Sequence, residues 1–405
     1  MCWKETCVVD ERTRFIVDWQ RGIGSMAALC EAYGISRKSG YKWRDRFVAG
    51  GFGELQDRSR ARHELGHRLA EEVATAVTEL REQHPLLGPR KLKAILERER
   101  PDVSWPAAST IGDLLRREGL SEPRRRQRRP LPVSQPFADA SQPNDVWCID
   151  FKGWFRTRDG QRCDPLTVSD AVSRYVLACR IVQPTTAGVR CACEHLFGER
   201  GLPLRLRMDN GSPFASTGPA GLTRLSVWWL KLGIDLERID PGAPQQNGRH
   251  ERMHGTLKKH TSRPPADTAA EQQVRFDNFT VYFNEFRPHE ALGQKTPASS
   301  YSASPRTFPE RLQEPWYDAD HAVRRVRPTG EIRWGGDFIF VSEALAGEPI
   351  GITETEKGDW LLRFCKLDLG LIDRKTKKLF RFAAARPGRR KAERNQKTVT
   401  HVPSP

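Results

Sequence analysis

The stretch PGAPQQNGRHERMHGTLKK, residues 241–259, decides how the rest of the chain is interpreted. Pro241 and Pro244 oppose helix formation, and Asn247 is a favoured N-cap type, so we expect a loop that leads into a helix. Helical spacing puts two sets of side chains on separate faces, namely His250, Met253 and Leu257, and Asn247, Glu251, His254 and Lys258. A carboxylate among basic and amide neighbours on a rigid element predicts that a cation binds there.

Length, charge and cysteine content limit the classes of protein to which the chain can belong. The 405 residues are 38% hydrophobic and carry a formal net charge of +16. This length allows two to four domains, and the charge favours a polyanionic partner such as double-stranded DNA over an ordinary basic surface. Nine cysteines without CxxC pairs favour a reducing, cytoplasmic setting. No stretch approaches the roughly 20 apolar residues of a membrane span, so we expect no membrane association.

The N-terminal region, residues 1–53, has the pattern of a helix-turn-helix DNA-binding domain. Apolar spacing predicts three short helices over residues 11–48, with Gly34 in a tight turn before the basic helix RKSGYKWRDRF, residues 37–47. The alternative is a helical hairpin without a DNA role, but the basic last helix favours DNA. Its candidate contacts are Arg37, Lys42 and Arg44.

Residues 54–120 repeat this three-helix pattern and predict a second helix-turn-helix-like domain. We expect helices over 69–83, from Gly88-Pro89 onward, and after Ser109 as an N-cap. Residues 121–143 are rich in Arg and Pro, which predicts an extended basic linker. Its arginines are candidates for phosphate contacts, among them Arg124, Arg125 and Arg126.

From residue 144 to 305 the pattern is that of an α/β domain. Three antiparallel strands, helix, strand, helix, strand, helix is the order of the ribonuclease-H-like fold. The predicted strands are 146–155, 165–170, 175–182, 204–208 and 234–239, and the predicted helices are 185–200, 222–232, the helix from 247 and 278–290, the last with a break at Arg287-Pro288.

The C-terminal part is predicted to be rich in β-structure. Short strands at 331–341, 349–356, 360–366 and 370–373 predict a small β-barrel over residues 320–385. Residues 386–405 combine basic charge with few apolar side chains, which predicts a disordered tail.

Three acids stand out in the α/β region. Asp150 lies in mid-strand, Asp209 ends a strand in an Asp-Asn-Gly turn, and Glu251 projects from the helix. A carboxylate in an apolar strand is costly unless it is paired or bound to metal. The alternatives are a hydrogen-bonded structural Asp, an ordinary turn, and a surface Glu paired with Arg252 or Lys258. Three converging carboxylates would suit Mg²⁺, and two such ions can clamp a phosphodiester.

Four motifs resemble DDE transposases of the retroviral-integrase superfamily, in the bacterial insertion-sequence group with an N-terminal helix-turn-helix. They are WCIDFKGWF (147–155), RMDNGSPF (207–214), PGAPQQNGRHERMHGTLK (241–258) and FRPHEALGQKTPASSY (286–301). The resemblance implies that Asp150, Asp209 and Glu251 hold two Mg²⁺ ions, with Mn²⁺ as a substitute. It also implies an enzyme that frees a 3′-hydroxyl at element ends and joins it to target DNA, as a homodimer or larger assembly.

The same resemblance suggests further residues. Asn210 and Gly211 would hold Asp209 in its turn, and substrate or supporting contacts are expected from Gln246, Asn247, Lys258 and His289. Between Asp209 and Glu251 lie 41 residues, more than in many relatives, and the surplus falls in the Gly/Pro-rich segment 212–225. The nearby acids Asp235, Glu237 and Asp240 are therefore alternatives for the third carboxylate.

Two other functions are compatible with the pattern. One is a DNA-binding regulator in which the helix-turn-helix units act and the core is inert, although all three acids are present. The other is a ribonuclease of the same fold, which would have no need for two sequence-reading units.

Overall fold

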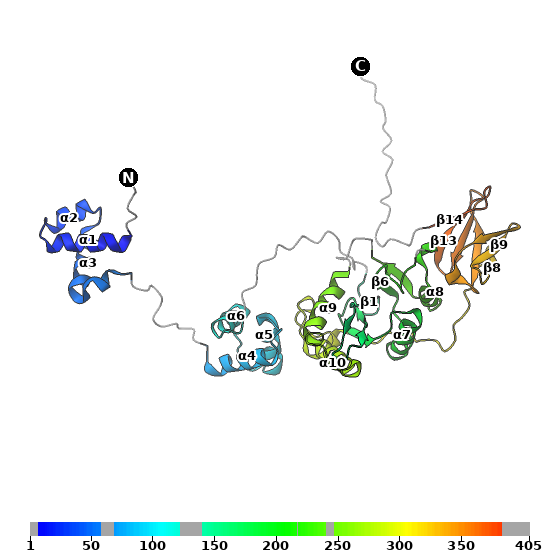
Figure 1. The fold of residues 1–405 in the computed structure, drawn as a ribbon, viewed down its shortest axis with the longest axis horizontal. Helices are drawn as coiled ribbons and strands as arrows, with labels where there is room; N and C mark the ends of the chain where they lie inside the picture. Colours follow the sequence, from blue (N-terminus) through cyan, green and yellow to red (C-terminus); the bar gives the residue numbers. More distant parts are fainter. Residues whose placement is uncertain (1–6, 58–68, 122–139, 217, 240–246, 383–405) are drawn as a thin grey trace, which may run out of the picture. The chain divides into compact units, whose positions relative to one another are not determined.

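The computed structural model describes residues 7–57, 69–121, 140–216, 218–239 and 247–382 (Figure 1). The chain divides into two compact units, residues 1–71 and residues 72–405. The finer domain boundaries expected from the sequence stay a prediction.

The first unit is a three-helix bundle of helix-turn-helix type. It consists of α1 (Val8–Gln20), α2 (Met26–Ala32), α3 (Arg37–Gly50) and a short 3-10 turn (Gly51–Leu55). The side chains of Ser25 and Ser36 accept hydrogen bonds at the starts of α2 and α3, which satisfies helix-end amides. A Cβ at Gly40 would lie 2.4 Å from the Cys30 sulfur, so glycine permits the close approach of α3 to α2.

The second unit begins with another three-helix group, α4 (Glu71–Gln83), α5 (Pro89–Glu99) and α6 (Ala108–Arg117). Its core is made of leucine and isoleucine side chains, among them Leu92, Ile95 and Leu115. The expectation that Ser109 caps the third helix is wrong, because the helix already starts at Ala108 and its N-cap is Ala107, which has no side chain to cap with. Most of the predicted linker, residues 122–139, lies outside the described residues.

A five-stranded sheet forms the centre of the α/β core. Its strand order is β5-β4-β1-β6-β7, with β1 antiparallel to β4 and parallel to β6. The strands are β1 (Val146–Phe151), β4 (Pro165–Asp170), β5 (Val176–Ile181), β6 (Arg205–Met208) and β7 (Asp235–Arg238). This arrangement confirms the predicted ribonuclease-H-like order. The buried strand β1 lies in the middle and carries Asp150.

Two pairs of helices cover the sheet. The helices α7 (Thr186–Arg200) and α8 (Arg224–Lys231) pack on the apolar cluster that includes Trp147, Ile149 and Trp229. The helices α9 (Gly248–Thr261) and α10 (Ala269–Val281) pack through a separate cluster that includes Met253, Leu257 and Phe276. The helix predicted from Asn247 is α9, which begins at Gly248 with Asn247 as its N-cap, as expected.

Two predicted boundaries in the core are wrong. The strand predicted over 146–155 ends at Phe151, because Gly153 takes a positive φ of 87° and a separate hairpin follows, β2 (Phe155–Arg156) and β3 (Arg162–Cys163). The helix predicted at 278–290 starts earlier, at Ala269, where the Thr268 side chain caps it. It continues as a π-helical turn, Tyr282–Phe286, and stops before Pro288.

The C-terminal sheet has the order β14-β13-β12-β11-β8. Its strands are β8 (Ala322–Arg325), β11 (Pro349–Glu354), β12 (Trp360–Phe364), β13 (Leu367–Ile372) and β14 (Leu379–Arg381). The single strand predicted over 331–341 is a hairpin, β9 (Glu331–Trp334) and β10 (Asp337–Phe340), because Gly335 and Gly336 both take positive φ and turn the chain. The predicted barrel is not confirmed, since the described strands form an open sheet and a separate hairpin.

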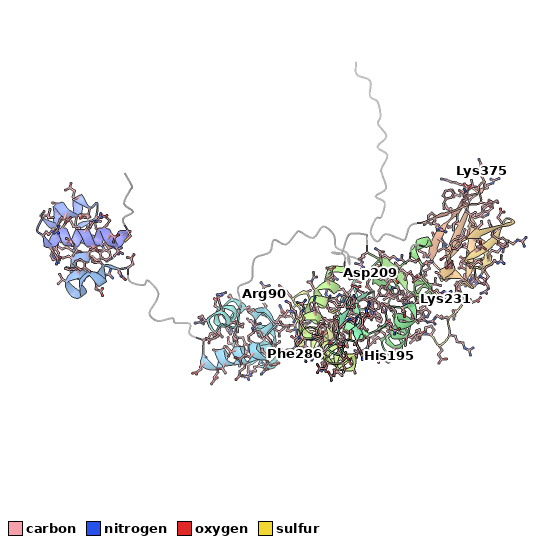
Figure 2. The ribbon with its side chains drawn as sticks, viewed as in Figure 1. Arg90, His195, Asp209, Lys231, Phe286 and Lys375 are labelled. Carbon is pink, nitrogen blue, oxygen red and sulfur yellow. The ribbon has the colours of Figure 1, made fainter. Side chains whose placement is uncertain are left out.

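This sheet shares its apolar core with the α/β domain. Ala220, Leu222, Val227 and Leu230 belong to the same buried cluster as residues of the C-terminal strands, such as Ile350. Lys231, labelled in Figure 2, lies at the end of α8 and forms a 2.9 Å ion pair with Glu348. Short 3-10 turns complete the unit at Pro219–Gly221, Glu290–Leu292, Ala298–Ser300 and Glu343–Leu345.

In the described part of the chain, none of the helices combines the length and apolarity needed to cross a lipid bilayer. The predicted disordered tail, residues 386–405, lies outside the described residues.

Candidate metal and active site

Asp150 is partly buried, as is Asp209, whereas Glu251 is exposed. Asp150 lies on the central strand β1, opposite Thr167 of β4, and its side chain is 21% exposed. Burial is the largest cause that raises the pKa of its carboxyl, and together with the negative charges of Asp209 and Glu251 it brings this pKa to about 7. The three acids come from separate elements: β1 carries Asp150, the adjacent strand β6 ends just before Asp209, and α9 carries Glu251.

Asp209 follows β6 directly, in a turn held by its neighbours. The Gly211 amide donates a 3.1 Å hydrogen bond to Asp209 Oδ1. The Asn210 side chain donates a 2.7 Å bond to the carbonyl of Ile239, just after β7. The Asp-Asn-Gly turn thus ties the ends of two parallel strands together and directs the Asp209 carboxylate.

Glu251 is exposed in the first turn of α9, whereas His250, Met253, His254 and Leu257 are buried. The predicted separation into two faces is wrong for His254, which is buried with His250, Met253 and Leu257, because the helix packs against Thr167 of β4. Among the alternative acids, Glu237 forms 2.8 Å ion pairs with Arg205 and Arg207, and Asp235 is exposed at the start of β7. Asp240 lies outside the described residues.

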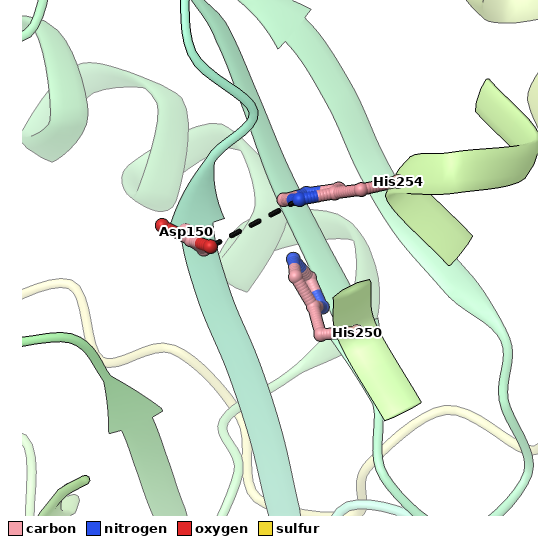
Figure 3. A group of neighbouring side chains, drawn as sticks. All are labelled: Asp150, His250 and His254. Atoms are coloured by element: carbon pink, nitrogen blue, oxygen red, sulfur yellow. Dashed lines mark ion pairs between the residues drawn. The ribbon is translucent and has the colours of Figure 1, made fainter. Parts of the chain in front are cut away.

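A cluster that the sequence analysis missed lies directly behind Asp150 (Figure 3). The buried Thr167 hydroxyl lies 2.7 Å from His250 Nε2 and 2.6 Å from His254 Nε2, and it donates a 3.0 Å hydrogen bond to the Asp150 carbonyl. The Ser169 hydroxyl lies 2.7 Å from His250 Nδ1. The sequence signal was Thr167 and Ser169, two polar residues on one face of an apolar strand, together with histidines four residues apart.

Both histidines in this cluster are neutral. Burial lowers the pKa of His250 to about 3 and that of His254 to about 2. His254 Nδ1 lies 4.0 Å from Asp150 Oδ2, the pair joined by the dashed line in Figure 3. Because the ring is uncharged, this contact is not a salt bridge, and a basic nitrogen faces the carboxylate.

The other candidates in the core occupy varied positions. Asn247 is buried at the start of α9, and its Oδ1 has no hydrogen-bond partner among the described residues. Lys258 is exposed on α9. His289 packs against Phe283, and its Nε2 is buried without a partner in the described part of the chain. Gln246 lies outside the described residues.

The candidate DNA contacts of the first unit lie on α3. Arg37 and Lys42 are exposed, and Lys42 lies over the ring of Trp43. Arg44 is half-buried and forms a 2.6 Å ion pair with Asp45. Arg124, Arg125 and Arg126 lie outside the described residues.

The donor set of the site fits a divalent cation. The Asp150 carboxyl, whose pKa is raised by burial and by the charges of Asp209 and Glu251, can bind a hard cation in place of its proton, and Mg²⁺ and Mn²⁺ both accept oxygen ligands. Asp150 and Asp209 would be the rigid ligands, since strands fix them, and Glu251 would complete the set from the helix.

Replacing Asp150 with asparagine is expected to stabilise the metal-free core at neutral pH. The raised pKa means that the folded chain holds this proton more tightly than the unfolded chain, so the wild type loses stability as pH rises from about 4 to about 7. The Asp150→Asn variant avoids this loss. Its free energy of unfolding should therefore exceed that of the wild type by an amount that grows over that pH range to at most about 4 kcal/mol, at about 1.4 kcal/mol per pKa unit. Thermal unfolding in EDTA at several pH values measures it. A pH-independent difference, like that expected for the exposed control Asp102→Asn, would contradict the prediction.

Comparisons with known proteins agree with the fold and the motifs. An integrase core domain family matches residues 140–244 and a related integrase core domain family matches residues 232–297. A helix-turn-helix domain family matches residues 11–63, and a homeodomain-like domain family matches residues 39–115.

Two relatives come from bacterial insertion elements. The insertion element IS476 uncharacterized 39.2 kDa protein of Xanthomonas euvesicatoria is 27% identical over 58% of this chain and 66% of its own length. The chain thus spans just under two thirds of that protein. The insertion element IS407 uncharacterized 31.7 kDa protein of Burkholderia multivorans is 29% identical over 58% of this chain and 82% of its own length. Among solved structures, the HTLV-2 integrase catalytic core domain in complex with magnesium is 16% identical, with a TM-score of 0.31, over 40% of this chain and 98% of that one.

The chain therefore carries helix-turn-helix domains and an integrase core domain. Its resemblance to insertion-sequence transposases of the retroviral-integrase superfamily is confirmed by these matches.

Proposed function

We propose that this chain is a transposase that binds the ends of a DNA element and cleaves them by metal-dependent phosphodiester hydrolysis. The cleavage frees a 3′-hydroxyl, which the same site then joins to target DNA. The observation that carries the proposal is the placement of Asp150 on the central strand β1, Asp209 at the end of the adjacent strand β6 and Glu251 on α9, around a ribonuclease-H-like sheet in a chain with helix-turn-helix units.

In this proposal Asp150, Asp209 and Glu251 hold two divalent ions, which would activate the attacking oxygen and neutralise charge on the leaving one. The protein's own contribution is position. The central strand fixes Asp150, and the turn bonded by Gly211 and Asn210 fixes Asp209. Glu251 lies on a helix that is anchored by its opposite, buried face. Such rigidity lowers the cost of organising the site for phosphoryl transfer.

DNA binding is assigned to the basic helical units. Exposed Arg37 and Lys42 lie on α3, the helix that reads DNA in a helix-turn-helix unit, and the net charge of +16 favours phosphate contacts throughout the chain. Two element ends must meet before joining, so we expect at least two copies of the chain to assemble on double-stranded DNA.

The test is cleavage of a labelled duplex that carries the inverted repeat flanking the gene. Nicking at the repeat end is expected with Mg²⁺ or Mn²⁺ and not with EDTA, and a scrambled end should remain intact. Sequence-specific binding without metal-dependent nicking would instead indicate a DNA-binding regulator. Cleavage of an RNA–DNA hybrid in preference to the duplex would indicate a ribonuclease.

A further inference from the structure

The protons on the two buried histidines can be assigned by counting hydrogen bonds at Thr167. A hydroxyl donates one hydrogen bond and accepts up to two. The carbonyl of Asp150 can only accept, so it receives the single Thr167 proton. Both histidine Nε2 atoms, at 2.7 and 2.6 Å, must then donate to the Thr167 oxygen. Each ring therefore carries a proton on Nε2.

This assignment leaves the two rings in different situations. His250 Nδ1 accepts the hydrogen bond of the Ser169 hydroxyl at 2.7 Å, so both of its nitrogens are satisfied. His254 Nδ1, by contrast, has no hydrogen-bond partner among the described residues. What it faces is Asp150 Oδ2, at 4.0 Å. An imidazole nitrogen and a carboxylate oxygen at this separation, in a group with His250 whose ligand atoms all lie within 4.8 Å of one another, can share one metal ion.

We propose that His254, through Nδ1, is a nitrogen ligand for the divalent ion at Asp150, an inference that rests on the metal-dependent function proposed above. Metal–nitrogen and metal–oxygen bonds of small divalent ions are each about 2.0–2.2 Å long. Opposite ligands of one ion are therefore separated by about 4 Å, which the separation between Nδ1 and Oδ2 matches. One nitrogen and one oxygen of this cluster already have the spacing that such an ion requires.

The nitrogen changes which ion the site prefers. Mg²⁺ binds oxygen and holds its waters, whereas imidazole is a good ligand for transition metals. Loss of His254 Nδ1 should therefore weaken Mn²⁺ binding and leave Mg²⁺ binding nearly unchanged. Thr167 acts as a positioning residue here, because its oxygen accepts a hydrogen bond from His254 Nε2 and so directs His254 Nδ1 toward Asp150.

The experiment is pulsed electron paramagnetic resonance of the full chain loaded with Mn²⁺, combined with calorimetric titrations of Mn²⁺ and Mg²⁺. We expect a nitrogen hyperfine coupling of a directly bound imidazole, which changes when the histidines are labelled with ¹⁵N. The His254→Gln variant is the sharp test, because glutamine Nε2 can still donate to Thr167 while Nδ1 is lost. It should lack the coupling and bind Mn²⁺ about tenfold or more weakly, a loss typical of disturbed metal ligation.

His195→Gln is the matched control, because His195 is an exposed histidine of α7 (Figure 2). This control should retain both the coupling and the Mn²⁺ affinity. Mn²⁺ that binds the wild type without a nitrogen coupling, a coupling that persists in His254→Gln, or no Mn²⁺ binding at all would each overturn the proposal. The labelled wild type needs no substitution, so the result does not depend on how well a variant folds. The nicking assay separates this outcome from the proposed function, which survives if Mg²⁺-dependent cleavage occurs on oxygen ligands alone.

Discussion

The Glu251→Gln variant is expected to lose metal-dependent cleavage of element-end DNA by about a thousandfold or more, while it binds the same DNA nearly as well as the wild type. An amide of the same size removes a charged metal ligand, and phosphoryl transfer depends mainly on charge and position. Glu251 is exposed and the packing face of α9 is the opposite one, so the fold should not change. Initial nicking rates and gel-shift affinities, measured on one labelled duplex, check both halves of this prediction.

The exposed Glu285→Gln is the matched control for this variant, since it removes an equal charge from a neighbouring helical segment. Its cleavage rate should equal that of the wild type. Nearly normal nicking by Glu251→Gln would show that the third acid is misassigned. Asp235 would then be tested next, because the ion pairs with Arg205 and Arg207 already engage Glu237.

The Trp147→Ala variant is expected to destabilise the α/β core by about 3–5 kcal/mol, the usual cost of removing a buried aromatic side chain. Trp147 is 0% exposed in β1 and packs near Phe197 of α7, with 6.1 Å between ring centroids. Its indole nitrogen donates a 3.0 Å hydrogen bond to Asn144 Oδ1, so the substitution also leaves a buried amide oxygen with one partner fewer. Hydrogen exchange of peptides from residues 144–208 measures the free energy of opening of this core alone.

Trp316, which is 81% exposed, provides the control. Trp316→Ala should change the same free energy by less than about 0.5 kcal/mol. Equal effects of the two substitutions would mean that β1 does not carry the core. Because Asp150 lies three residues after Trp147 on that strand, the prediction also tests how firmly the first acid is held.

The order of elements could be predicted from the sequence because each strand and helix of the core has its own apolar pattern. Strand β1 is buried along its first four residues, and α9 starts at the expected N-cap, Asn247. The first turns of α10 are hard to predict because the sequence AAEQQVRFD, residues 269–277, is largely polar on its exposed side. The local sign of the helix start is the N-cap residue Thr268. The prediction of one strand in place of the β9–β10 hairpin was wrong because Gly335 and Gly336 form a turn between two apolar segments.

The histidine cluster could not be predicted from spacing within α9 alone. The burial of His254 depends on Thr167, which is 87 residues away and reaches the helix only when β4 pairs with β1. The helical spacing predicted the face of α9 on which Glu251 lies, but it did not predict that His254 is buried. Tertiary contacts of this kind, between a polar strand residue and a polar helix residue, leave only weak marks in one sequence.

The apolar cluster shared by the α/β core and the C-terminal sheet has a practical consequence for dissecting the protein. The segment 212–225, where the sequence predicts the surplus length between Asp209 and Glu251, contributes Ala220 and Leu222 to that cluster, and α8 contributes Val227 and Leu230. A fragment that ends before residue 320 would expose these apolar side chains to water, and an exposed apolar patch of this kind promotes aggregation. The segment 212–225 thus joins the two parts through apolar contacts, and the smallest catalytic fragment that stays soluble should extend through residue 382.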